Sequence, residues 1–214
     1  MAIKRKGNET KERILSYSKQ EFYENGYNDT WVKTIAEKAD MRLGNLNYYF
    51  NKKDDIVKEI YEQFTVQLYD YIESQGEYTE LQKYCNFAMM FYHTVFSDEQ
   101  NKKFYHEVIV NKSNYRILHE LMKDYYKNII QSLNLELSDT DFEIFILTEF
   151  GSRREIFLAY LSEELTISFD DLIVYVLTNL CKNLSVEATE ITEMLEIAAD
   201  FFNNNDYSHV KFLV

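Results

Sequence analysis

The near-absence of helix-breaking residues constrains the fold of this chain more than any other feature. Its 214 residues include no Pro and only five Gly. Apolar residues, which make up 46% of the chain, recur mostly three or four positions apart, and this spacing places them on one face of an α-helix. We therefore predict an all-α fold with enough apolar residues for a sizeable core.

The same spacing, together with capping residues, predicts where helices begin and end. Gly26 suits the left-handed position after the first helix, and Thr30 is placed to cap the second. Thr79 and Gln82 have the spacing of a capping box. The predicted helices cover residues 10–25, 31–39, 43–50, 54–74, 79–96, 98–110, 114–133, 139–163, 169–184 and 187–203.

Charge is distributed unevenly along the chain. Residues 1–59 hold 12 Lys and Arg against 10 Asp and Glu, a balance of +2, whereas residues 60–214 hold 11 against 26, a balance of −15. A slightly basic first part on a strongly acidic remainder suggests two separate tasks. Lys4, Arg5 and Lys6 form either a basic N-terminal arm or a solvated tail.

Several locations are disfavoured by the sequence. No apolar run approaches the roughly 18 residues of a membrane span, and the charged N-terminus lacks the apolar segment of a signal peptide. We therefore expect a cytoplasmic protein without membrane contact. Cys85 and Cys181 lie far apart and are expected to be reduced, partly buried thiols.

Catalytic motifs are also missing from the sequence. It contains no P-loop, GxGxxG or GxSxG, and its four His residues are not paired at the spacing of helical metal ligands. We expect neither an enzyme nor a bound metal or cofactor.

The segment TWVKTIAEKADMRLGNLNYYF, residues 30–50, reads as two short helices joined by a tight turn. This is the pattern of a helix-turn-helix unit, whose second helix lies in the major groove of DNA. Ala36 and Ala39 are small enough to let the two helices approach closely. The residues left to face outward are Arg42, Leu43, Asn45, Asn47 and Tyr48. Arg pairs well with guanine and Asn with adenine, although ordinary surface polarity also accounts for the two asparagines.

Residues 10–57, TKERILSYSKQEFYENGYNDTWVKTIAEKADMRLGNLNYYFNKKDDIV, resemble the TetR family of bacterial transcriptional regulators. The matching features are RIL, NGY, T-x-V-x-x-IA-x-x-A and G-x-L-x-Y-x-F at fixed spacing. The resemblance implies phosphate contacts by Thr30, Trp31, Tyr48 and Lys53, and base contacts by Arg42, Leu43, Asn45 and Asn47. Asp40 departs from the family, which usually has Gly there, and Asn47 stands where an aromatic residue is common.

The resemblance also implies a domain organisation and an assembly. We expect a three-helix DNA-binding head over residues 1–53, a larger helical ligand-binding and dimerisation body over 54–204, and a C-terminal tail over 205–214. The family forms homodimers through its last large helices, here 139–163 and 169–184. The apolar stripes of these helices face either the partner or the core of their own subunit.

The family usually binds a small molecule in the body. Two features suggest which residues line this small-molecule site. One is the density of aromatic residues, and the other is a possible ion pair between Glu149 and Arg153, which lie four residues apart. The ion pair could instead lie at the rim of the dimer interface, and Gly151 between the two indicates close approach of a partner helix or a ligand. The candidate ligand-binding residues are Met89, Tyr92, His93, Phe96, Tyr105, Tyr125, Glu149 and Arg153.

The leading hypothesis is a transcriptional repressor that binds double-stranded DNA as a homodimer and is released by a small-molecule effector. The alternative is a helical interaction protein that keeps this fold but binds a protein partner instead of DNA.

Overall fold

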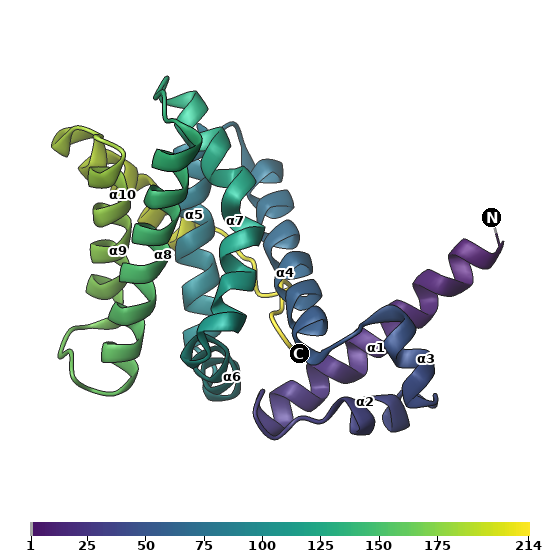
Figure 1. Cartoon of the computed structure of the whole chain (residues 1–214). Coiled ribbons are helices and arrows are strands. Elements are labelled where there is room, and N and C mark those ends of the chain that lie inside the picture. The colour runs from purple at the N-terminus through teal and green to yellow at the C-terminus, as the bar shows by residue number, and fades with distance from the viewer. Residues whose placement is uncertain (1) are drawn as a thin grey trace.

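A computed structural model describes the backbone of residues 2–214, and the side chains of these residues except 2–6 and 112–115. The described chain forms ten α-helices and no strand, so the predicted all-α fold is confirmed (Figure 1). The helices are α1 (Ala2–Asn25), α2 (Val32–Lys38), α3 (Leu43–Tyr49), α4 (Lys53–Gln75), α5 (Glu80–Phe96), α6 (Glu99–Val110), α7 (Lys112–Ser132), α8 (Asp139–Leu161), α9 (Phe169–Asn183) and α10 (Ala188–Asn204).

The helix ends agree with the predictions to within about two residues, with one exception: α1 begins at Ala2 and not near residue 10. The backbone of Lys4, Arg5 and Lys6 is therefore helical, while their side chains lie outside the described residues. The capping box at Thr79 is present, with the Gln82 N–H donating to the Thr79 hydroxyl at 3.3 Å and the Thr79 N–H donating to the Gln82 side chain at 2.9 Å.

Thr30 does not cap α2, so that prediction is wrong. The residue at the N-cap position is Trp31, which makes no capping hydrogen bond through its side chain. The Thr30 hydroxyl instead lies 2.6 Å from the Gly26 carbonyl oxygen and 3.0 Å from that of Glu21. It holds the loop between α1 and α2 against the end of α1.

Helices α1, α2 and α3 form a small head at one end of the molecule (Figure 1). Its core is made by apolar side chains that the helical spacing of each segment directs inward, including Ile14, Phe22, Ile35, Leu46 and Phe50, all of them buried. Burying each large side chain stabilises the head by about 1.5–3 kcal/mol. These contacts fix how α3 sits relative to α1 and α2.

The body is a bundle built around α5. Eleven of the 17 residues of α5 are buried, which is typical of a helix surrounded by others. Both cysteines, Cys85 on α5 and Cys181 on α9, are free and fully buried. No helix in the described part of the chain is both long enough and apolar enough to cross a bilayer.

Two structures join the head to the body. The first is α4, which is unbroken, as predicted. The second is α6: the Phe104 ring lies 4.9 Å from the Phe22 ring, and the Asn28 N–H donates to Glu107 Oε2 at 2.7 Å. Gly26 has φ of +80°, and a Cβ added there would lie 2.7 Å from the Glu107 carboxylate. The left-handed φ favours glycine at this position, and a side chain there would also have to displace the Glu107 carboxylate.

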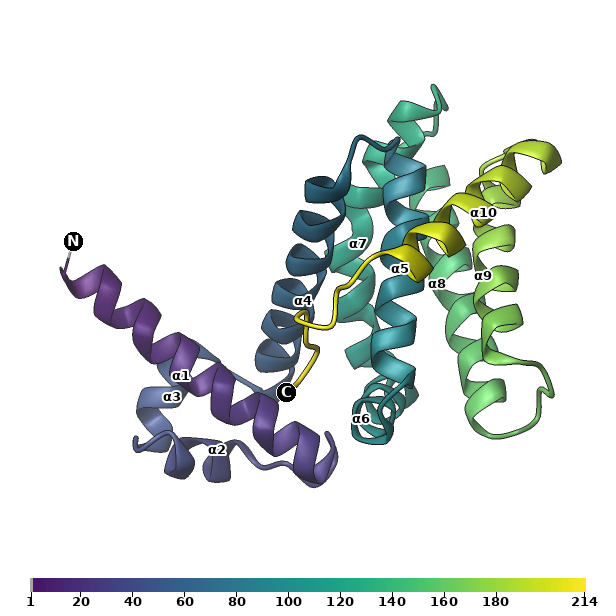
Figure 2. The same cartoon turned by 180° about the vertical axis from the view of Figure 1, so that it is seen from behind.

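The tail after α10 runs back across the body toward the head (Figure 2). Val210, Phe212 and Leu213 are buried, and the Phe212 ring packs among the rings of Tyr61, Phe64 and Phe104. Three residues of the segment 205–214 thus pack into the core, while the others lie at the surface or are partly buried.

Candidate nucleic-acid interface and buried polar cluster

The turn between α2 and α3 is set by backbone hydrogen bonds. The Met41 N–H donates to the Ala36 carbonyl at 3.0 Å and the Asp40 N–H to the Glu37 carbonyl at 3.1 Å, the pair of bonds that ends a helix in the Schellman arrangement. Asp40 has φ of +50°, in the left-handed region that favours glycine. This residue therefore adopts the conformation for which the family pattern has Gly.

Helix α3 presents a polar face to solvent because its apolar residues anchor the opposite side. Leu46 is fully buried and Phe50, which follows α3, is 3% exposed. The residues predicted to contact DNA lie on the surface: Arg42, Asn45 and Asn47 are exposed, as are Leu43 and Tyr48. The structure thus brings together five of the eight predicted residues on one short helix and its N-cap.

The other three predicted residues lie at the start of α2 and α4, and only Trp31 is fully presented to solvent, with 71% of its surface exposed. Thr30 is buried. The Lys53 ammonium donates to the carbonyls of Tyr27 at 2.6 Å and Thr30 at 3.0 Å and lies 4.0 Å from the centre of the Tyr27 ring. Burial lowers the pKa of Lys53. The Lys53 ammonium, for which the resemblance implies a phosphate contact, is thus engaged by the loop before α2.

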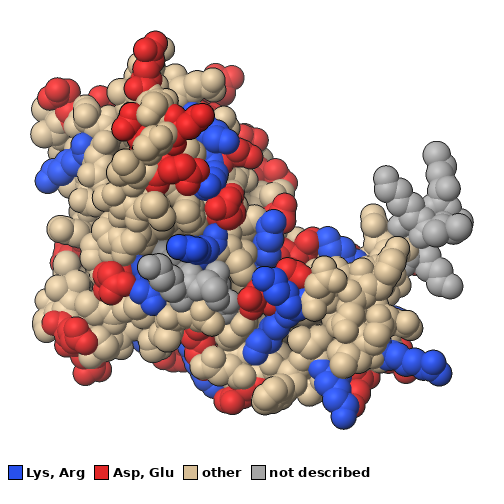
Figure 3. Space-filling view, in the orientation of Figure 1, with Lys and Arg blue, Asp and Glu red and all other residues tan. Residues whose placement is uncertain are grey.

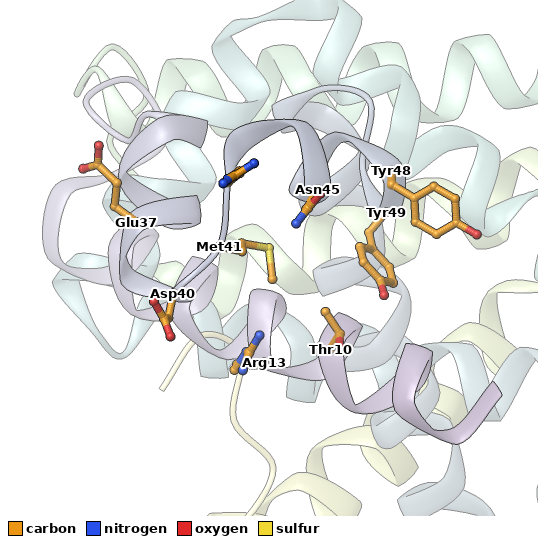
Figure 4. Close-up of a pocket in the computed structure, with 9 residues that line it drawn as sticks. Thr10, Arg13, Glu37, Asp40, Met41, Asn45, Tyr48 and Tyr49 are labelled. Atoms are coloured by element: carbon orange, nitrogen blue, oxygen red, sulfur yellow. The ribbon is translucent and has the colours of Figure 1, made fainter. Parts of the chain in front are cut away.

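An open hollow of about 830 Å³ lies between α1 and the turn before α3 (Figure 4). Arg13 of α1 points into it from one side, with Asn45 and Tyr49 of α3 on the other. Sequence reasoning missed Arg13 and Tyr49, because no local pattern shows that α1 passes beside α3. Glu37 and Asp40 place two carboxylates on the same hollow.

Figure 3 shows Lys and Arg extending from the lower edge of the head, whereas Asp and Glu are frequent over the upper body.

The second candidate site is a buried polar cluster in the body. Arg153 pairs with Glu149, and both side chains are almost completely buried. The Arg153 guanidinium also donates to the hydroxyls of Tyr84 at 2.6 Å and Tyr126 at 3.0 Å, and these hydroxyls share a hydrogen bond of 2.6 Å. The alternative that this ion pair lies at the rim of a dimer interface is wrong, because the pair lies inside its own subunit.

A small cavity of about 40 Å³ adjoins this cluster. It is lined by side chains of five helices: Tyr61, Thr65, Tyr84, Phe87, Ala88, Phe91, Tyr92, Tyr105, Leu118, Leu121, Met122, Phe150 and Arg153. Of the predicted ligand-binding residues, Tyr92, Tyr105 and Arg153 line it, and Glu149 contacts Arg153 directly.

The remaining predicted ligand-binding residues do not line this cavity. The Phe96 ring stacks on Phe169 at 4.6 Å, the His93 ring lies 4.1 Å from Phe202, and Tyr125 stacks on Tyr69 at 4.2 Å. Met89 is buried on α5 but does not line the cavity either. Phe91, a further candidate by aromatic density, also lines the cavity. The missed residues Tyr84, Phe87 and Ala88 share one face of α5 with Phe91 and Tyr92, and their spacing of three and four positions is a signal that could have found them.

The outer faces of α8 and α9 carry exposed apolar side chains. Ile144 and Leu147 on α8 are 56% and 55% exposed, and Val174 and Tyr175 on α9 are 40% and 55% exposed. Gly151 lies on the same side of α8 as Ile144 and Leu147, and a Cβ added to it would meet open space. The apolar stripes that the sequence shows on these two helices face mainly the core of their own subunit. Their buried members are Ile146, Phe150, Phe157, Leu172, Ile173, Val176, Leu177 and Leu180.

Comparison with known proteins relates the head to a family model and the whole chain to solved folds. Residues 14–60 match the family model described as bacterial regulatory proteins, tetR family. Solved structures with similar folds include RolR in complex with the ligand resorcinol, with a TM-score of 0.60 at 16% identity over 93% of this chain and 96% of that one. A tetR-family transcriptional regulator from Streptomyces coelicolor gives 0.54 at 12% identity over 93% and 90%.

A third structure, a gamma-butyrolactone receptor described as ArpA-like, gives a TM-score of 0.50 at 14% identity over 94% of this chain and 100% of that one. A comparison with curated proteins gives no match. At these identities the solved structures establish the fold, and the family model covers the second half of α1, all of α2 and α3, and the start of α4.

Proposed function

We propose that this chain, which belongs to the TetR family of bacterial regulatory proteins, is a homodimeric repressor that binds operator DNA through α3 and leaves it when a small molecule occupies the body. The observation that carries this proposal is the exposed polar face of α3, held outward by the buried Leu46 and Phe50.

The exposed residues of α3 suit the edges of base pairs. Arg42, Asn45 and Asn47 supply the donors and acceptors that read guanine and adenine in the major groove, and Leu43 can contact a thymine methyl group. Trp31 at the N-cap of α2 and Tyr48 on α3 are both exposed, and they can make phosphate contacts, which position the helix without specifying sequence.

For Thr30 and Lys53 we propose a role other than direct contact with DNA alone. Thr30 holds the loop before α2, and Lys53 holds the same loop through two carbonyls, while its positive charge can still attract a phosphate. Thr30 and Lys53 are therefore expected to affect DNA binding by holding Trp31 in position. Lys53 also contributes its positive charge.

One recognition helix reads few base pairs, so we expect two copies of the head to act together. The apolar outer faces of α8 and α9 suit pairing with a second copy, because exposed apolar patches of this kind are typical of interaction sites. The bare surface at Gly151 suits close approach of a partner helix. A homodimer would place two α3 helices about one DNA turn, roughly 34–36 Å, apart.

The body cavity is the proposed effector site because it combines apolar walls with a few convergent polar groups. Tyr61 and Thr65 of its wall belong to α4, the helix that begins at Lys53 beside the head. An effector that prefers the dimer with displaced heads would therefore weaken DNA binding. The complex of RolR with resorcinol and the description of another structural neighbour as a receptor support an effector in this fold.

The direct test is binding of the purified dimer to the DNA upstream of its own coding sequence, with a random duplex of equal length as control. We expect a sequence-specific complex at low salt. If the folded dimer binds both duplexes equally or binds neither, the proposal fails.

The alternative of a protein partner is favoured by one observation, the two carboxylates of Glu37 and Asp40 beside α3. A salt titration separates the two functions. Contacts to phosphates make the logarithm of affinity fall linearly with the logarithm of salt concentration, and a flat response would favour the protein partner.

A further inference from the structure

We infer that the effector of the body cavity is an uncharged molecule about the size of one aromatic ring, bearing a hydrogen-bond acceptor, and that the Glu149–Arg153 pair excludes anions. This inference rests on the proposed function, because it assigns the chemistry of the site proposed there. It concerns binding, and it can fail while regulation by some other ligand remains.

The cavity walls set the apolar part of the ligand. Most of the lining is aromatic, with Phe87 and Phe91 on α5 facing Phe150 on α8. Flat rings in such a lining gain both apolar burial and favourable ring contacts. Because the cavity is small, with a volume of about 40 Å³, we take one ring as the size of the ligand that requires the least enlargement.

The polar groups that line the cavity are hydroxyls and the Arg153 guanidinium, and the carboxylate of Glu149 lies behind Arg153, with Oε2 lacking a hydrogen-bond partner in the described chain. The hydroxyls of Tyr84 and Tyr126 already accept hydrogen bonds from Arg153. Burial raises the pKa of Tyr84, Tyr92 and Tyr126, so these hydroxyls keep their protons at neutral pH.

Two buried polar atoms of lining residues have no hydrogen-bond partner within the described chain. They are the Tyr61 hydroxyl and Arg153 Nε. A buried polar group left without a partner costs about 1–3 kcal/mol, and a carbonyl or ether oxygen on a ligand would satisfy one of these donors. The ligand is therefore expected to carry an acceptor.

The charge of the site decides between a neutral acceptor and an anion. Among the described lining residues only Arg153 is charged, and Glu149 already neutralises it. His119, whose ring stacks on Phe150 at 5.3 Å, adds no charge because burial lowers its pKa. An anionic ligand would consequently be buried without a free counter-charge, which is strongly unfavourable.

The cavity must enlarge before it can hold a ring. Its volume is about 40 Å³, whereas a cavity of about 150 Å³ is known to accept benzene. The wall formed by Leu118, Leu121 and Met122 belongs to α7, and methionine adapts readily to changed packing. Ligand entry is therefore expected to displace α7, which packs against α4.

The test compares two probes of nearly equal shape by calorimetry on the full-length dimer at pH 7.5. Acetophenone carries a neutral carbonyl, and benzoate carries a carboxylate in the same place. We expect acetophenone to bind with a Kd on the order of 1 mM or tighter and at least about tenfold more tightly than benzoate. Ethylbenzene, which lacks the acceptor, should bind more weakly than acetophenone.

Glu149→Gln provides the decisive variant, because it leaves the Arg153 charge without its partner. The order of affinities should then reverse, with benzoate bound more tightly than acetophenone. The double variant Glu149→Gln, Arg153→Met removes both charges. It should show neither the acetophenone preference of the wild type nor the benzoate preference of Glu149→Gln. Circular dichroism and the melting temperature check that each variant is folded.

The inference is overturned if wild-type protein binds benzoate as tightly as acetophenone, if Glu149→Gln leaves their order unchanged, or if neither probe binds. These outcomes are distinguishable from failure of the proposed function, because DNA binding by the same preparation is measured separately.

Discussion

The ring of Phe212, two residues from the C-terminus, lies 5.0 Å from the ring of Tyr61 on α4. Tyr61 lines the body cavity, so the end of the chain packs against the back of the cavity wall. Leu213 and Val214 continue to α1, where they border a surface hollow together with Leu15 and Tyr23. The tail thus contacts the cavity wall and the head.

Truncating Phe212 should weaken the whole fold. Phe212→Ala removes a fully buried ring and is expected to lower the free energy of unfolding by about 3–5 kcal/mol, measured by urea unfolding at fixed dimer concentration. Val214→Ala is the matched control, because Val214 is 52% exposed and its loss should change stability by no more than about 0.5 kcal/mol. Equal effects of the two changes would show that the tail is not part of the core.

Replacing Asp40 by Gly should strengthen both the fold and DNA binding. The change relieves a left-handed conformation and should stabilise the protein by about 0.5–1 kcal/mol. It also removes a negative charge beside DNA. Glu163→Gly is the control, because Glu163 has φ of +62° and also carries a negative charge, but lies after α8. Fluorescence anisotropy should show tighter DNA binding for Asp40→Gly only; an equal gain for both variants contradicts the assigned location of the site.

Asn47 and Lys53 should affect DNA binding in different ways. Asn47→Ala is expected to cost about 1–3 kcal/mol on the operator and little on random duplex. Lys53→Ala should weaken binding to both duplexes and also lower the melting temperature, because Lys53 holds the loop before α2. If Asn47→Ala loses the same affinity for both duplexes, Asn47 does not contact bases.

A charge on the outer face of α8 should prevent dimer formation. Leu147→Arg places a cation where Leu147 is 55% exposed in the single chain, and sedimentation velocity should show a monomer. Val110→Arg is the matched control at a position of similar exposure, 53%, on α6, and it should leave the dimer intact. A Leu147→Arg variant that remains dimeric would place the interface elsewhere.

The sequence was sufficient to predict the head because its information is local. The inward positions of Ile35, Leu46 and Phe50 follow from helical spacing within each segment, and the outward face of α3 follows from what remains. The left-handed conformation of Asp40 was not predicted, since Asp does not require it; the usual Gly of the family at this position is the signal that could have indicated it.

The site in the body could not be predicted in detail because its contacts are distant in sequence. Arg153 meets Tyr84 and Tyr126 across 69 and 27 residues, and no local pattern specifies which of 18 tyrosines it contacts. The same applies to Lys53, whose partners lie 26 and 23 residues earlier in the chain. Packing of the helices decides these pairings.

The central claim is that two α3 helices of a dimer enter neighbouring major grooves of one duplex, and hydroxyl-radical footprinting of the upstream DNA tests it most directly. We predict two protected segments on one face of the duplex, with centres separated by about one helical turn or a multiple of it, and loss of both in Asn47→Ala. A folded dimer that protects no segment, or protects only one, would contradict the claim.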